Sequence, residues 1–174
     1  MKLNKLIAIA TISLLSGGIS MAQKALNLED IVAGNIIQTK GIGSMTWLKD
    51  GERYSRLENN KQTGGTDIVA YRAKDNSREV IIPSSLLTDK STGRPIPVRS
   101  VSWSADNEKV LIYNNTRRVW RYDTRGDYWV LNLKDGALRQ LGKGMPESSM
   151  MFAKFSPDGT RVAYVSNNNI YVED

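Results

Sequence analysis

The chain has 174 residues, 40% of them hydrophobic and 24% charged, which is typical of a globular fold. It contains neither cysteine nor histidine. This excludes disulfides, a thiolate nucleophile, the usual zinc sites and a Ser-His-Asp triad within these residues. The net charge of +6 comes mostly from scattered basic residues, so we expect no nucleic-acid partner. No motif for a cofactor or a metal is present, and we expect neither.

The first residues have the layout of a secretory signal peptide. Two lysines precede an uncharged apolar run, Leu6–Leu15, and small residues stand where a signal peptidase cuts. The run is shorter than the about 20 apolar residues that a membrane-spanning helix needs. We therefore expect residues 1–22 to be a signal peptide cleaved after Ala22, and the protein to be exported, either periplasmic or secreted.

Residues 23–42 differ from the rest of the chain and are interpreted as an N-terminal lead-in segment. Asn27 stands before a short run that begins at Leu28 and has helical character. Asparagine is a favoured residue just before the first turn of a helix. We expect one short helix here.

Three segments, beginning at Trp47, Trp103 and Phe155, repeat one pattern. Each begins with an aromatic residue and two spacers, followed by Asp and then by either Gly or Asn. One spacer, a basic residue, and an apolar or aromatic residue complete the pattern. Asp-Gly and Asp-Asn favour tight turns because both second residues tolerate positive φ. We expect each aromatic residue to close a strand with its face in the core. The next strand then starts with alternating apolar residues.

A second hairpin signal follows the first two copies, with turns at Asp75-Asn76 and Asp135-Gly136, and a third begins at Asn169. Each unit thus holds about four strands in about 50 residues, the size of a propeller blade. The predicted fold class is all-β: an incomplete β-propeller of about two and a half four-stranded blades over residues 43–174, after the signal peptide and the short helix. The alternative is an ordinary sandwich with coincidental hairpins.

The stretch from Asn114 to Trp129 combines four arginines with several large aromatic residues. It is expected to join the second and third strands of a blade as a projecting loop. Arginine offers a planar fork for a carboxylate or carbonyl oxygen. The simpler alternative is a solvated loop whose arginines pair with Asp123 and Asp127. Within it, Arg125-Gly126-Asp127 spells an adhesion-type tripeptide, but it lies at a strand start, and turn chemistry is the favoured explanation of Gly-Asp.

These segments resemble the N-terminal propeller of the dipeptidyl peptidase IV family, within the prolyl oligopeptidase group. The resemblance is carried by the run from Val110 through Trp120-Arg121-Tyr122 to Leu133, and by Phe155–Val165 followed by Asn168–Val172. The lead-in Leu26–Ile31 is similar too. The resemblance covers essentially all of the chain beyond the signal peptide.

The resemblance implies a serine peptidase that removes X-Pro or X-Ala dipeptides from peptide N-termini. Its triad would lie in a C-terminal α/β-hydrolase domain beyond Asp174, so no catalytic residue is expected here. Arg121 matches the family arginine that binds a substrate carbonyl oxygen. Asp123 departs from the family, which often has serine there, and could pair with Arg121. The expected partners are such peptides and the hydrolase domain, and the full-length protein could form a homodimer.

The sequence therefore predicts the propeller portion of an exported dipeptidyl peptidase, inactive by itself. The main alternative is a non-catalytic exported propeller that binds a protein or glycan partner. A degenerate gene product that never folds is a third interpretation.

Overall fold

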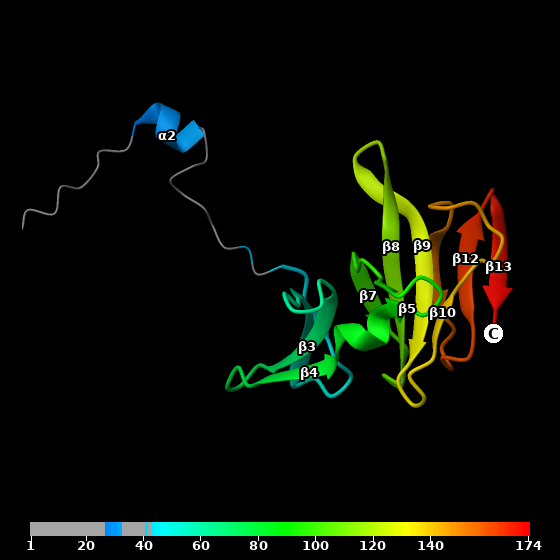
Figure 1. The fold of residues 1–174 in the computed structure, drawn as a ribbon, viewed down its shortest axis with the longest axis horizontal. Helices are drawn as coiled ribbons and strands as arrows, with labels where there is room; N and C mark the ends of the chain where they lie inside the picture. Colours follow the sequence, from blue (N-terminus) through cyan, green and yellow to red (C-terminus); the bar gives the residue numbers. More distant parts are fainter. Residues whose placement is uncertain (1–26, 33–40, 42) are drawn as a thin grey trace, which may run out of the picture. The chain divides into compact units, whose positions relative to one another are not determined.

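The computed structural model describes residues 27–32, 41 and 43–174 (Figure 1). The helix predicted after Asn27 is present as α2, Leu28–Val32, and its first turn is closed by a 3.3 Å hydrogen bond from the amide of Ile31 to the carbonyl of Asn27. Across these ranges no helix is both long and apolar enough to cross a bilayer. The predicted signal peptide lies outside the described residues and stays a prediction.

From residue 43 onward the fold is all-β, as predicted. The first sheet is ordered β1 (Thr46–Trp47), β2 (Arg53–Asn59), β3 (Thr66–Arg72), β4 (Arg78–Ile82). The second is ordered β10 (Leu138–Gln140), β9 (Tyr122–Asn132), β8 (Lys109–Val119), β7 (Ser100–Trp103). The third is ordered β11 (Met151–Phe155), β12 (Val162–Ser166), β13 (Asn169–Glu173). All the strand pairs in these sheets are antiparallel.

A small hairpin between the first two sheets has no counterpart in the sequence prediction. It consists of β5 (Thr88–Asp89) and β6 (Arg94–Pro95) and follows a short 3-10 helix, η1 (Ser84–Leu87). The buried carboxylate of Asp67 on β3 holds this segment, because it accepts a 2.7 Å hydrogen bond from the amide of Ser84. The connection is therefore structured rather than a plain loop.

The three copies of the repeated pattern adopt the same backbone. Their turn residues Gly51, Asn107 and Gly159 have φ values of 69°, 58° and 67°. In each copy the residue after the aromatic one donates its amide to the carbonyl five positions on, as Ser104 does to Lys109 at 3.0 Å. The turn aspartate also accepts an amide two positions on in every copy. The predicted tight turns are confirmed.

The second hairpin of the first two sheets is also one structure formed twice. Asn76 and Gly136 occupy the left-handed region at φ 56° and 68°. Each preceding aspartate accepts the amide two residues further on, at 2.9 Å in both turns. Asn167 and Asn168, at φ 49° and 63°, make the corresponding β12–β13 connection. Asparagine and glycine stand at these positions because they tolerate positive φ.

Apolar residues on facing sides of the first two sheets form one core cluster. Its fully buried members come from β3, β4, η1, β8 and β9: Ile68, Ile82, Leu87, Val110, Ile112 and Leu131. Trp103 packs against this cluster, and its indole nitrogen donates to the hydroxyl of Ser55 on β2 at 3.2 Å. Packing and a directional bond therefore both join these two sheets.

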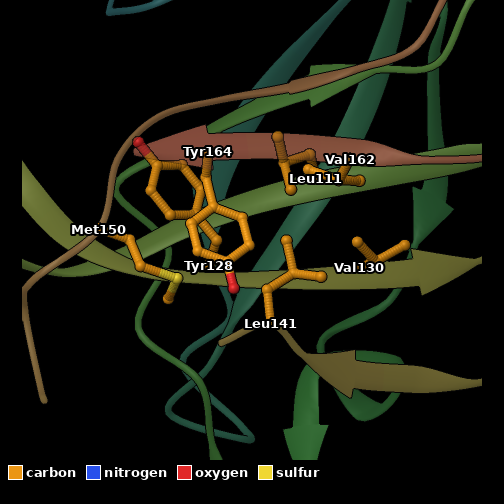
Figure 2. Close-up of a cluster of buried hydrophobic side chains, with 7 residues drawn as sticks. All are labelled: Leu111, Tyr128, Val130, Leu141, Met150, Val162 and Tyr164. Atoms are coloured by element: carbon orange, nitrogen blue, oxygen red, sulfur yellow. The ribbon is translucent and has the colours of Figure 1, made fainter. Parts of the chain in front are cut away.

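The opposite side of the second sheet packs on the third. Figure 2 shows side chains from β8, β9, β12 and the adjoining segments converging on one cluster: Leu111, Tyr128, Val130, Leu141, Met150, Val162 and Tyr164. The first and third sheets thus cover the two faces of the second sheet, which explains the nearly continuous apolar runs in β8 and β9.

One prediction about the aromatic residues is wrong. Trp103 and Phe155 pack against the two clusters, but Trp47 is 60% exposed. Trp47 contacts the edge of Tyr54, with ring centres 5.9 Å apart, and Tyr54 stacks on Tyr71. The physical reason is that within the described residues no sheet covers this side of the first sheet.

Candidate functional site

The predicted loop at Asn114–Trp129 is instead an extension of two long strands. β8 and β9 stay paired through Val119 and Tyr122, and only Trp120 and Arg121 connect them. β7 pairs with β8 only as far as Tyr113, and β10 pairs with β9 only from Trp129. The hairpin therefore extends past its neighbouring strands (Figure 1). We call residues 115–126 the arm.

The tip of the arm has an unusual backbone. Trp120 has φ of 60°, in the left-handed region that bulky side chains rarely occupy, and its side chain is 94% exposed. Neither turn chemistry nor burial explains a tryptophan here. Such a residue, strained and exposed at once, points to a role in binding.

Arg121 follows at the tip and is also exposed. Its carbonyl oxygen accepts a 3.5 Å hydrogen bond from the guanidinium of Arg118. Its own guanidinium makes no ion pair or hydrogen bond within the described part of the chain. Arg121 therefore presents a planar, permanently charged donor that is free for a ligand.

Asp123 does not pair with the arm arginines, contrary to the simpler interpretation of the sequence. Its carboxylate lies 3.2 Å from the guanidinium of Arg99, which precedes β7. Its carbonyl oxygen accepts a 3.0 Å hydrogen bond from the hydroxyl of Tyr113. Burial, with the neighbouring Tyr128 and Asp123, raises the pKa of Tyr113 to about 12, so its hydroxyl stays a donor at neutral pH.

Asp127 is also engaged elsewhere. It is 6% exposed, and its two oxygens accept hydrogen bonds from the amide of Ser148 at 2.8 Å and the side-chain amide of Asn115 at 2.7 Å. Gly126 beside it is buried and bridges to Met150. An aspartate held in this way cannot serve as an adhesion motif, so the tripeptide is structural.

A cavity of about 580 Å³ opens at the base of the arm. Its lining includes Arg99, Asn114, Asp127 and Trp129. The side-chain oxygen of Asn114 is buried and has no hydrogen-bond partner. Neither here nor in the rest of the described ranges does a group of three acidic side chains stand close enough to hold a metal ion. The lining thus combines charged and amide side chains with one aromatic residue, Trp129.

The sequence singles out Arg121 and the aromatic residues near it, and the substrate role of Arg121 stays a prediction, whereas Arg99 and Ser148 carry no sequence signal. These two residues remove both acidic groups from the arm arginines. Arg99 lies 24 positions before its partner, and no local pattern marks it. Only the pairing of β7 beside β8 brings it close, because the amide of Arg99 donates to the carbonyl of Tyr113 at 2.9 Å.

A family model described as the dipeptidyl peptidase IV N-terminal region matches residues 104–174. These residues include the arm, the turns at Asn107 and Gly159, and the third sheet. Over this segment the chain is similar to the N-terminal region of these peptidases.

Relatives extend the match over most of the chain. "Dipeptidyl aminopeptidase B" from Saccharomyces cerevisiae is 27% identical over 152 residues, covering 82% of this chain and 17% of that protein. "Probable dipeptidyl-aminopeptidase B" from Aspergillus terreus is 25% identical over 166 residues, covering 90% of this chain and 18% of that protein. The chain thus spans less than a fifth of these relatives.

The fold agrees with a solved structure. Dipeptidyl peptidase 4 from Porphyromonas gingivalis superposes with a TM-score of 0.67 at 20% identity, covering 86% of this chain and 20% of that one. The chain is thus similar to the N-terminal region of the dipeptidyl peptidase IV family over residues 104–174, and its fold is like that of the solved structure.

Proposed function

We propose that this chain is the propeller portion of an exported serine dipeptidyl peptidase that removes X-Pro or X-Ala dipeptides from peptide N-termini. The two four-stranded sheets would be full blades, and the three-stranded sheet part of a third. Because the chain has no histidine, it holds no Ser-His-Asp triad. Hydrolysis therefore requires a separate α/β-hydrolase domain, and this chain alone should not cleave a Gly-Pro chromogenic substrate.

Arg121 is the residue that we propose contacts the substrate. The observation that carries this proposal is the free guanidinium of Arg121 at the tip of the arm. Asp123, the acidic residue of the arm, is paired with Arg99 instead. A guanidinium held on a paired hairpin can donate to a peptide carbonyl oxygen and hold the substrate in register for attack. It binds and orients; it does not take part in bond making.

The coding DNA after Asp174 tests the proposal first. An open frame that continues to a Gly-x-Ser-x-Gly elbow supports the peptidase. A stop codon after a few more blades, with no elbow, would falsify it and favour the binding scaffold.

The encoded longer enzyme tests Arg121. R121Q should lower kcat/KM for Gly-Pro substrates by about 10- to 100-fold, the equivalent of about 1.4 to 2.7 kcal/mol of lost transition-state binding. R94Q, which removes an exposed charge outside the arm, is the control and should stay within about threefold. Equal losses in both variants would mean that net charge, not Arg121, matters.

Export is tested separately. We propose that the signal peptide is removed after Ala22. The protein recovered from the periplasm or the medium should then begin at Gln23. An intact N-terminus on protein found only in the cytoplasm contradicts this.

A further inference from the structure

The arm has a strand edge, along β8, that no described strand covers. Beyond Tyr113 on β8 and before Trp129 on β9, neither β7 nor β10 continues the sheet. On the β8 side, the backbone amides and carbonyls of residues 116–119 that point away from β9 therefore make no ladder within the described chain. An exposed edge of this kind can accept one additional extended strand.

Two arginines stand opposite each other on this arm. Arg117 and Arg125 are register partners, so both side chains project from the same face of the hairpin. Like charges in directly opposite positions destabilise a strand pair. Neither guanidinium has an ion-pair partner among the described residues. The cost of this arrangement is removed when an anion lies between them.

The acidic residues that could have neutralised this pair are held elsewhere. Asp123 pairs with Arg99, and Asp127 accepts from Ser148 and Asn115. The fold thus keeps the acidic side chains of Asp123, within the arm, and Asp127, directly after it, away from the cationic pair. The register also shifts on both sides of Arg117, a type of bulge that re-aims side chains.

Two exposed aromatic residues adjoin the cationic pair. Trp120 and Tyr122 are 94% and 74% exposed. Tryptophan, tyrosine and arginine are the residues that contribute most to protein–protein binding. The composition of the arm is therefore that of a peptide-binding surface, whereas a nucleic-acid site needs a broader basic face.

We propose that the arm binds an extended acidic peptide, which adds a strand to the free β8 edge and places a carboxylate between Arg117 and Arg125. A free backbone edge favours a peptide over other polyanions, because only a polypeptide main chain can continue the ladder. The proposal uses Arg117 and Arg125 rather than Arg121, and it does not depend on the peptidase function.

The test is fluorescence anisotropy with the full chain and a labelled peptide of alternating glutamate and valine. Binding should weaken at least about tenfold in the R117Q/R125Q variant, as expected when charge-assisted contacts are lost. It should also weaken when NaCl rises from about 0.05 M to about 0.5 M, because salt screens exposed charges. The same peptide methylated on alternate backbone nitrogens should bind poorly, since it cannot pair with a strand.

The control variant R72Q/R94Q removes two exposed arginines away from the arm and changes the net charge equally. It should retain the affinity of the parent. R117Q/R125Q should unfold at the same urea concentration as the parent or a higher one, because a repulsive pair is removed. A merely structural role for the two arginines would instead lower this midpoint.

Three results would overturn the proposal. One is equal binding by R117Q/R125Q and R72Q/R94Q, and another is equal binding of the N-methylated peptide. The third is binding of an oligonucleotide or of phosphatidylglycerol vesicles as tight as that of the peptide and equally dependent on Arg117 and Arg125.

Discussion

The guanidinium of Arg99 lies 3.2 Å from the carboxylate of Asp123, and this ion pair engages the acidic side chain of the arm. Asp123 stands two residues after Arg121 and opposite Arg118 in the hairpin register. Without Arg99, an acidic group would lie among the arm arginines. A residue outside the arm therefore holds this carboxylate away from the arm arginines.

The first prediction concerns this pair. R99Q should release the Asp123 carboxylate to the arm arginines and weaken binding of the acidic peptide about fivefold, while stability changes by less than about 1 kcal/mol because the pair is exposed. Anisotropy and urea unfolding measure the two effects. The double variant R99Q/D123N should restore affinity; if it binds as weakly as R99Q, Asp123 is not the competitor.

The second prediction concerns the core between the first two sheets. Ile112 is fully buried in it, so I112A should lower the free energy of unfolding by about 2–5 kcal/mol. Ile170 is 77% exposed on β13, and I170A should change it by less than about 0.5 kcal/mol. Urea unfolding followed by tryptophan fluorescence measures both. Similar effects of the two substitutions would contradict the packing of β8 described above.

The third prediction concerns the base of the arm. A Cβ atom at Gly126 would lie 2.6 Å from the carbonyl oxygen of Asn114 and would overlap the ring of Tyr113. G126A should therefore destabilise the fold by about 1–3 kcal/mol. Gly41 has open space around it, so G41A is the matched control and should be neutral. Thermal unfolding distinguishes the two, and an unchanged midpoint for G126A argues against this close approach.

The fourth prediction concerns pH. Burial alone raises the pKa of the Glu173 carboxyl, but hydrogen bonds from Tyr164, the amide of Gly142 and Arg139 outweigh it. The net pKa lies below its ordinary value of 4.5. Because the folded pKa is the lower one, this carboxylate stabilises the fold above pH 4.5, and the contribution is lost as pH falls further.

E173Q tests this directly. It should lower stability at neutral pH by about 1 kcal/mol and reduce the loss of stability on acidification. Urea midpoints at about pH 7 and about pH 3.5 give the comparison. E147Q, at an exposed position, is the control and should follow the parent at both pH values. A parent-like acid response in E173Q would mean that other carboxyls dominate.

Much of the strand pattern was predictable because it depends on nearby residues. The turns at Gly51, Asn107 and Gly159 need only a residue that tolerates positive φ and an aspartate that accepts the next free amide. These contacts span a few positions in the chain. Apolar residues on either side of each turn then predicted the strands, and the strands predicted the all-β class.

The arm was predictable in composition but not in shape. Its polar residues and arginines predict a loop, because a solvated hairpin and a loop have similar sequences. In the structure β8 and β9 continue to the tip, because the strand pairing that starts in the buried cores continues along both strands. Likewise, nothing near Trp47 indicates that its sheet has an uncovered side.

The sequence by itself therefore determined the repeated turns, the strands between them and the presence of an arginine-rich, aromatic segment. Only the tertiary structure decided which charges stay free. Ion pairs such as Arg99 with Asp123, and buried acceptors such as Asp127, depend on strands from different parts of the chain lying side by side. Two charges neutralise each other only when they lie within a few ångströms in space, and their separation along the chain does not give this distance.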